Sequence, residues 1–313
     1  MNKFSKKVIF VFKIIILLLI VCLFIALYIL NVDNVDNFSK IQEDSSKNIS
    51  EEKTDKTYAY MVKDNKLYAT LNDNLWHEVP VNLDKVIGID SQTNEIDNKL
   101  YQITDEKTMF VYKENKEFMI ISSDDGGKNW INNKLEIKDS ESENTQPMYV
   151  HFVSPNDVKA VICYDVAMQK AMVKIIESSD CGKSWITKKS GTDGYLSINL
   201  QSKIVFFYTN LGYISSPLNG GDSAKLYMTG DGGDSFSQVS FQEQYLKGHN
   251  SNVYLSWKDI YDFPSIPKKV GNQLEVTVTQ GNDGDYLGGK ISAKYISNDM
   301  GTTWEFIEEY IPN

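Results

Sequence analysis

Four short segments of the chain set a carboxylate beside a hydroxyl and a glycine at one fixed spacing, S/T-x-D-x-G-x-x-W/F. Such a carboxylate could hold a metal ion, or it could fold back onto nearby backbone N–H groups and close a tight turn. The hydroxyl adds to that network, and the glycine supplies a backbone with positive φ. We interpret the following residues as structural turns rather than as a catalytic or metal site: Ser123, Asp125, Gly127, Trp130, Ser178, Asp180, Gly182, Trp185, Thr229, Asp231, Gly233, Phe236, Ser297, Asp299, Gly301 and Trp304.

The four segments recur at the spacing of a supersecondary unit. Their central aspartates are 55, 51 and 68 residues apart. An apolar run rich in β-forming residues precedes each segment, and a short alternating run follows it, as in residues 304–307. The aromatic residue that ends each segment packs its ring against neighbouring strands. The pattern therefore predicts a strand–turn–strand unit repeated along an all-β domain.

This pattern resembles the Asp-box repeat, also called the bacterial neuraminidase (BNR) repeat, over residues 57–313. The resemblance implies a sialidase-like β-propeller of four-stranded blades, in which the box is a staple between the third and fourth strands, away from the site on the propeller axis. A degenerate segment at 70–76 adds a fifth unit. We expect about five blades, with six as the alternative, and ring closure that pairs residues 58–62 with material from the C-terminus.

The basic residues argue against the activity that the family name suggests. Sialidases resemble this chain in their boxes, but they hold the substrate carboxylate with three arginines. All 32 basic residues here are lysines, and lysine cannot reproduce the two-pronged hydrogen bonding of a guanidinium group. We therefore expect no sialidase activity, and we assign no catalytic residue and no cofactor.

The remaining groups that could bind a metal or form a bond are scattered. The histidines lack the spacing of a zinc site; they are His77, His151 and His249. The loop 282–285, Asn-Asp-Gly-Asp, offers oxygen ligands for Ca²⁺ but is also a common solvated turn. Cys163 and Cys181 fall in one repeat unit, so they form either a disulfide or two separate thiols. We predict no metal site.

The N-terminal region has the pattern of a membrane anchor. Lysines precede the uncharged run Ile14–Leu30, which at ~1.5 Å per residue is ~25 Å long and reaches ~34 Å with Val8–Phe12 included. Acidic residues follow it, which places the N-terminus in the cytoplasm. We expect residues 1–30 to be a lysine-rich tip and transmembrane signal anchor, 31–56 a disordered polar stalk, and 57–313 an extracellular domain. A cleaved signal peptide is the alternative, but no small-residue cleavage site follows the run.

The net charge of the chain excludes some classes of partner. Beyond residue 30 the chain has 42 acidic residues and 28 lysines, a net charge of −14, which repels nucleic acid and anionic lipid headgroups. The expected partners are the membrane, through the N-terminal helix, and a protein or glycan ligand on the propeller face. The sequence favours a non-catalytic binding or assembly module at the cell membrane. The alternative is a glycan hydrolase or lyase that does not act on sialic acid, which requires two carboxylates roughly 5–10 Å apart in a pocket.

Overall fold

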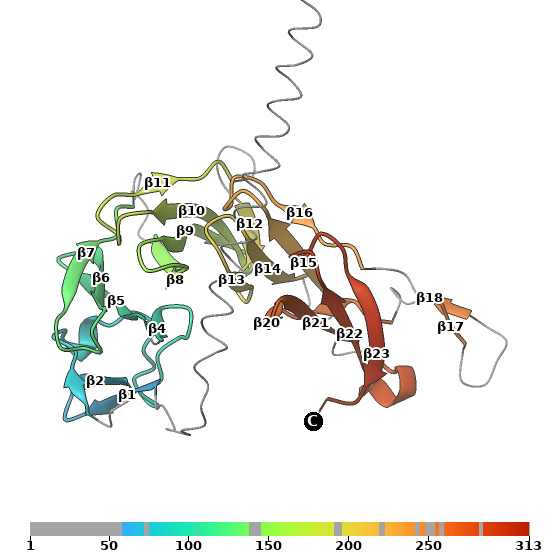
Figure 1. Ribbon diagram of the computed structural model, residues 1–313, viewed down its shortest axis with the longest axis horizontal. Helices are drawn as coiled ribbons and strands as arrows, with labels where there is room; N and C mark the ends of the chain where they lie inside the picture. Colours follow the sequence, from blue (N-terminus) through green and yellow to red (C-terminus); the bar gives the residue numbers. More distant parts are fainter. Residues whose placement is uncertain are drawn as a thin grey trace, which may run out of the picture. The chain divides into compact units, whose positions relative to one another are not determined.

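The computed structural model divides the chain into two compact units, Met1–Asp55 and Lys56–Asn313. It describes part of the second unit: residues 58–71, 75–104, 106–137, 145–190, 196–218, 223–241, 245–247, 254–256, 260–281 and 284–312. No helix within these ranges has the length and apolar character needed to cross a membrane. The predicted anchor and stalk lie outside the described residues (Figure 1).

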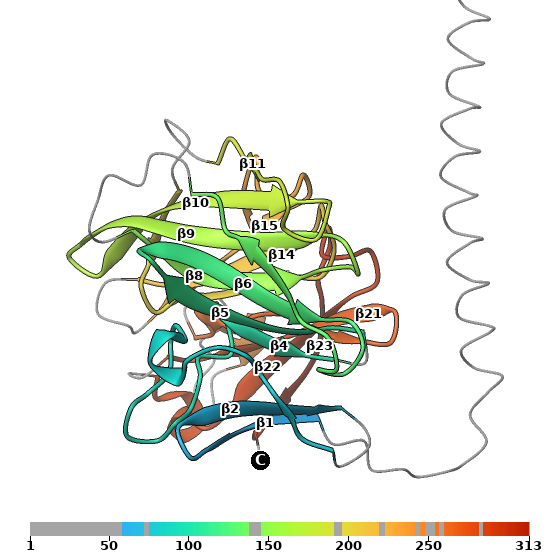
Figure 2. The same cartoon turned by 90° about the vertical axis from the view of Figure 1, so that its left-hand side faces the viewer.

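The described residues form antiparallel sheets that follow one another along the chain (Figures 1 and 2). The first sheet contains β1 (Tyr58–Lys63), β2 (Lys66–Leu71) and β3 (His77–Glu78). The second contains β4 (Tyr101–Ile103), β5 (Thr108–Glu114), β6 (Glu117–Ser123) and β7 (Ile131–Lys134). The third contains β8 (Gln146–Phe152), β9 (Val158–Ala167), β10 (Lys170–Ser178), β11 (Ile186–Thr187) and β12 (Leu196–Asn199).

The fourth sheet contains β13 (Lys203–Phe206), β14 (Gly212–Pro217), β15 (Ala224–Thr229) and β16 (Ser237–Gln238). The fifth contains β19 (Phe263–Pro264), β20 (Lys268–Val270), β21 (Gln273–Thr279), β22 (Ser292–Ser297) and β23 (Glu305–Tyr310). In the sequence between these two sheets, β17 (Tyr245–Lys247) and β18 (Tyr254–Ser256) pair with each other. The described residues also form two short 3-10 helices in connections, Leu83–Lys85 and Tyr286–Gly289.

The burial of each strand follows from how many of its faces are covered. Five consecutive residues of β5 are buried, as expected for a strand packed on both faces. In β21, buried and half-buried residues alternate strictly, so only one of its faces lies in the core. The second sheet is therefore an interior layer, and the fifth has a face that the described residues cover only in part.

Four clusters of buried side chains each join two successive sheets. Representative pairs, one residue from each sheet, are Leu67 and Phe110, Met109 and Val150, Val161 and Ile214, and Tyr213 and Tyr295. The sheets thus pack face to face in chain order, as blades do in a β-propeller. The all-β prediction is confirmed at this level.

Ring closure differs from the expectation. Among the described strands β1 pairs only with β2, and β23 pairs only with β22. The predicted pairing of residues 58–62 with C-terminal material is therefore wrong for the strands described here. Within the described part of the chain, no strand lies on the far side of β1, whereas β4, β8 and β13 occupy that place beside β5, β9 and β14.

Candidate functional site

Each of the four turns closes with the same hydrogen bonds. In the first, the Ser123 hydroxyl donates to Asp125 Oδ1 at 2.8 Å and accepts from the Gly127 N–H at 2.8 Å. Asp125 Oδ1 also accepts from the Asn129 N–H at 2.9 Å. The corresponding contacts recur in the other turns, around Asp180, Asp231 and Asp299.

These hydrogen bonds hold the aspartates ionised. Donors from Asn129 and Ser123 lower the pKa of Asp125 to about 2, and donors from Ser184 and Ser178 do the same for Asp180. Within the described ranges, no three His, Cys, Asp or Glu side chains come together in a way that could hold a metal ion. The turn carboxylates are occupied by their own backbone, so they are unsuited to binding a ligand.

The turns also contain a feature that the sequence pattern missed. Besides the glycine two places after the aspartate, the residue directly after the aspartate has positive φ in every turn. In two turns that residue carries a side chain: Cys181 has φ 62° and Met300 has φ 58°. The turn hydrogen bonds impose this conformation on residues that would otherwise avoid it.

The positive φ turns a carbonyl group toward the preceding sheet. Asn133 Nδ2 donates to the Cys181 carbonyl at 2.8 Å, and the Tyr213 hydroxyl donates to the Met300 carbonyl at 2.9 Å. A Cβ atom placed on Gly301 would lie 1.7 Å from the Tyr213 hydroxyl oxygen. Gly301 is therefore needed for the close approach of two sheets as well as for its backbone conformation. The turns seat one sheet on the next, which is a structural role.

A cavity of about 400 Å³ lies at the opposite ends of the strands, between the fourth and fifth sheets. It is bordered by the start of β15, whereas the turn 229–236 follows the end of that strand. Its buried wall is apolar, and its exposed rim is mostly polar. The wall includes Leu226, Val278 and Tyr295, and the rim includes Leu218, Gln238, Ser240 and Asp262.

A tyrosine that lines this cavity pairs with a glutamate. Tyr261, which is 5% exposed, lines the cavity and donates its hydroxyl hydrogen to Glu309 Oε1 at 2.6 Å. Burial, followed by the hydrogen bond to Glu309, raises the pKa of Tyr261 far above its usual value. The phenol therefore stays protonated at neutral pH and orients the Glu309 carboxylate. The ring of Tyr286 meets Tyr261 edge-on at 6.3 Å and supports it.

A carboxylate also lines the cavity, one residue after Tyr261. Asp262 lines the cavity with an exposed side chain, and its carbonyl accepts the Ala224 N–H at 3.0 Å, which fixes its backbone to the start of β15. The cavity is thus lined by an exposed carboxylate and by a tyrosine that binds a second carboxylate. Two carboxylates roughly 5–10 Å apart can transfer a proton to a leaving oxygen and activate a nucleophile. Nothing in the sequence singled out these three residues.

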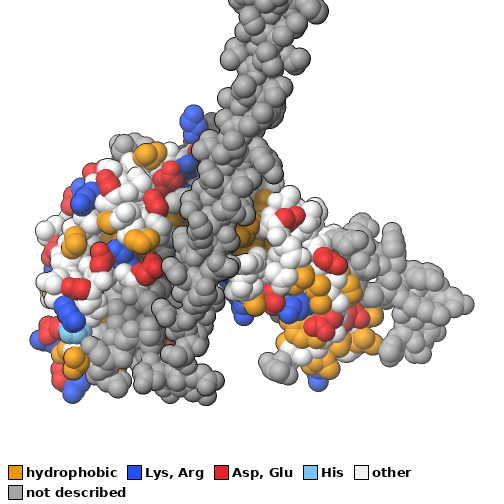
Figure 3. Space-filling view, viewed as in Figure 1, with side chains coloured by type: hydrophobic (Ala, Val, Ile, Leu, Met, Phe, Trp, Pro, Cys, Tyr) orange, Lys and Arg blue, Asp and Glu red, His pale blue; other side chains and the backbone are white. Residues whose placement is uncertain are grey.

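Hydrophobic side chains gather over the fifth sheet, with acidic side chains among them (Figure 3). Its exposed members include Leu287, Ile307 and Ile311. This surface of the fifth sheet is apolar and acidic, and the chain contains no arginine. It is poorly suited to a strongly anionic ligand.

The other sequence candidates that lie among the described residues do not form a site. Cys163 is buried and Cys181 half-buried, and both are free thiols, so the disulfide alternative is not formed. His151 stacks on Tyr149 at 4.6 Å, and a ring nitrogen lies 2.9 Å from the Asn98 carbonyl oxygen, which is a structural contact. Two of the remaining candidates, His249 and the 282–283 part of the oxygen-rich loop, lie outside the described residues.

No protein-family description and no curated protein matches this chain. Solved structures do resemble it. The NanB sialidase from Streptococcus pneumoniae is 11% identical with a TM-score of 0.36, over 70% of this chain and 33% of the sialidase chain. The α-L-arabinofuranosidase Arb93A from Fusarium graminearum is 15% identical with a TM-score of 0.39, over 71% of this chain and 70% of its own. The Hadza microbial sialidase Hz136 is 14% identical with a TM-score of 0.42, over 80% of this chain and 54% of its own.

This chain therefore spans about a third of the length of NanB and about half that of Hz136. The three names are those of enzymes that cleave glycans, whereas the sequence favoured a non-catalytic binding or assembly module. That prediction is contradicted by the comparison.

Proposed function

We propose that this protein is a glycan hydrolase that acts at the cavity between the fourth and fifth sheets. The observation that carries the proposal is the hydrogen bond of 2.6 Å to Glu309 from Tyr261, which lines the cavity together with Asp262. Most glycoside hydrolases use two carboxyl groups, one to protonate the leaving oxygen and one to activate water or attack the sugar. We assign the first role to Asp262 and the second to Glu309.

The environment of each carboxylate supports this division of roles. Asp262 is exposed on the rim, where it can exchange its proton with solvent between turnovers. Glu309 receives a hydrogen bond from a buried phenol, which fixes the orientation of its carboxyl group. Tyr261 is then a positioning residue in this scheme, since a phenol with a raised pKa is a poor nucleophile.

The substrate is a neutral glycan in this proposal. The chain has no arginine with which to bind a carboxylate in two-pronged fashion. Its outer part is strongly acidic, which raises the cost of bringing an anionic sugar to the cavity. The buried wall formed by Leu226, Val278 and Tyr295 matches the apolar face of a sugar ring.

The test is hydrolysis of a panel of neutral chromogenic glycosides and polysaccharides by the full chain. Glu309→Gln and Asp262→Asn should each lower kcat by about 100-fold or more, the usual contribution of an acid or base. The matched control is Glu308→Gln, which changes an exposed carboxylate paired in register with Lys294. Unfolding in urea should report similar stability for all three variants. Activity that survives both cavity substitutions would refute the proposal, as would a wild-type protein that cleaves only sialosides.

We also infer that the sheets belong to an Asp-box propeller of five blades. The support is the set of four seated turns together with the degenerate segment 70–76, where the Thr70 hydroxyl is buried without a hydrogen-bond partner. The hydroxyl stands where Ser123 closes its turn in the next sheet. An experimental structure with six complete blades would contradict this count.

We further propose that residues 1–30 anchor the protein in the cell membrane with residues 31–313 outside. The support is the lysine-flanked apolar run and the acidic chain that follows it. Protease treatment of intact cells should remove the C-terminal domain. Protection of that domain until the cells are lysed would rule out this orientation.

A further inference from the structure

Almost every edge strand of these sheets has a feature that hinders pairing with a further strand. The outer strands β3, β11 and β16 are two residues long. β8 contains Pro147 and a register shift beside it, and β23 contains three glutamates and pairs across a register shift. Short strands, prolines, charges and bulges are the devices by which proteins prevent unwanted pairing at a sheet edge.

β1 has none of these devices. It is six residues long, Tyr-Ala-Tyr-Met-Val-Lys, and its pairing with β2 runs without a shift from Tyr58 to Lys63. It contains no proline, and its one charged residue, Lys63, stands at the turn. Among the strands that the structure describes, it is the longest regular edge without such a device, and its sheet lacks the neighbour that β4 provides for β5.

The register identifies which backbone groups of β1 are unpaired. Lys63 and Lys66 flank the two-residue turn and form a hydrogen-bonded pair. Alternation then directs the N–H and C=O groups of Tyr58, Tyr60 and Val62 away from β2. No backbone group of a described residue pairs with them. This edge can accept a complete strand.

We propose that β1 of a second copy of this chain pairs with this edge, antiparallel, and joins two first sheets into one. β1 can supply such a strand, because Tyr58, Tyr60 and Val62 are residue types that favour strands and their backbone groups face away from β2. When the two strands are centred on Tyr60, all three outward-facing residues find partners, and Tyr58 lies opposite Val62 of the other copy. Residues 47–57, directly before β1, hold only one large apolar residue, Ile49, and lack this strand-forming composition.

Charge does not oppose the pairing. In the centred register Lys63 lies opposite position 57 of the other copy, which is a threonine, so like charges are not placed face to face.

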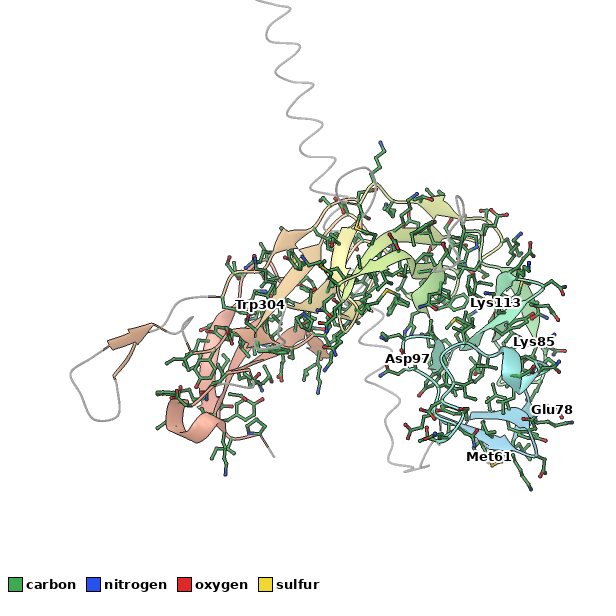
Figure 4. All side chains as sticks on the ribbon, turned by 180° about the vertical axis from the view of Figure 1, so that it is seen from behind. Met61, Glu78, Lys85, Asp97, Lys113 and Trp304 are labelled. Atoms are coloured by element: carbon green, nitrogen blue, oxygen red, sulfur yellow. The ribbon has the colours of Figure 1, made fainter. Side chains whose placement is uncertain are left out.

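An antiparallel pair of identical strands is related by a twofold axis, and a twofold interface closes after two copies instead of growing into a fibre. The proposal is independent of glycan hydrolysis. Figure 4 labels Met61 on β1 and Glu78 on β3.

The first test is the mass of the full chain in detergent micelles by sedimentation, which should correspond to a dimer. Val62→Pro should yield a monomer, because it removes an N–H that faces the free edge and leaves the β2 hydrogen bonds in place. Val62→Ala is the matched control and should remain a dimer. A wild-type monomer at all concentrations would overturn the proposal, as would a dimer unaffected by Val62→Pro.

A second measurement keeps the test valid if Val62→Pro fails to fold. In the centred register Ala59 lies opposite Met61 of the other copy as a non-hydrogen-bonded pair, with Cα atoms about 4.5 Å apart, within the range for a disulfide. Oxidation of an Ala59→Cys/Met61→Cys double variant should give covalent dimers, identified by peptide mapping. Each single variant should give far fewer. Equal yields from the single and double variants, or a bond within one chain, would refute this register and the proposed partner.

Discussion

The first and second turns, 123–130 and 178–185, have the same internal hydrogen bonds but differ in how they meet the preceding sheet. Trp185 is 6% exposed, and its Nε1 donates to the Lys134 carbonyl at 3.0 Å and the Gly182 carbonyl at 3.1 Å. Trp130 is half-buried, and its Nε1 lacks a hydrogen-bond partner. The sequence motif therefore specifies the turn, whereas the neighbouring sheet determines how firmly the turn is held.

The reason lies in the sheet that receives each turn. The second turn sits on β7, whose Asn133 side chain and Lys134 carbonyl both reach it. The first turn sits beside β3, which is two residues long and offers His77 as a packing contact near Gly127. Because the first unit is degenerate, its outer strand makes fewer contacts with the turn that follows it, and that turn is held less firmly.

The largest difference should come from removing the two tryptophans. Trp185→Ala should lower the free energy of unfolding by about 3–5 kcal/mol, because it empties a buried site and leaves two carbonyl groups without a donor. Trp130→Ala should cost about 1–3 kcal/mol, since that ring is half-exposed and loses no hydrogen bond. Urea unfolding followed by circular dichroism measures both values. Equal losses of unfolding free energy would show that the preceding sheets hold the two turns equally firmly.

A smaller effect should separate two glycines that share positive φ. Gly301→Ala should cost roughly 2–4 kcal/mol, because the new methyl group adds backbone strain and displaces the Tyr213 hydroxyl. Gly182→Ala should cost roughly 1–2 kcal/mol from backbone strain alone, since a Cβ atom added there would lie 3.4 Å from its nearest neighbour, the Trp185 ring. The comparison uses the same thermal or urea unfolding assay. A larger loss for Gly182→Ala would mean that the close approach to Tyr213 is unimportant.

The contact between Asn133 and Cys181 should have a still smaller effect. Asn133→Ala removes the donor to the Cys181 carbonyl and should cost about 1 kcal/mol, the usual net value of one hydrogen bond. The neighbouring Asn132→Ala is a control on the same strand, since Asn132 accepts from Tyr112 within the second sheet. In a double-mutant cycle with Trp185→Ala, Asn133→Ala should be coupled and Asn132→Ala should not.

Low pH should reduce the stability that both turns contribute to the same extent, and neither contribution should be reduced at neutral pH. Hydrogen bonds lower the pKa of Asp125 and Asp180 from 3.8 to about 2, so each contributes stability above pH 4 that is lost as the pH falls toward 2. Asp125→Asn and Asp180→Asn should each reduce, to a similar degree, the change in the free energy of unfolding over that pH range. A response confined to Asp180→Asn would place the difference between the turns inside the turn itself.

Sequence reasoning reached the repeated unit because Asp, Gly and Trp act locally at fixed spacing. It missed the positive φ of Cys181 and Met300, since neither residue type favours that conformation and only the formed turn imposes it. It also missed the cavity pair. Tyr261 and Glu309 are 48 residues apart and meet only when the chain before β19 packs beside the end of β23. Forty-two acidic residues gave no local signal that would distinguish Glu309.

The seating of each turn on the preceding sheet gives the stack a direction that matches synthesis. The receiving groups, such as Asn133 and Tyr213, always precede in sequence the turn that they hold. With turns 51 to 68 residues apart, synthesis at roughly 5–20 residues per second delivers a new turn every several seconds. Each turn therefore emerges after its receiving sheet, and the domain can assemble in the order in which it is made, without an early segment having to wait for a late one.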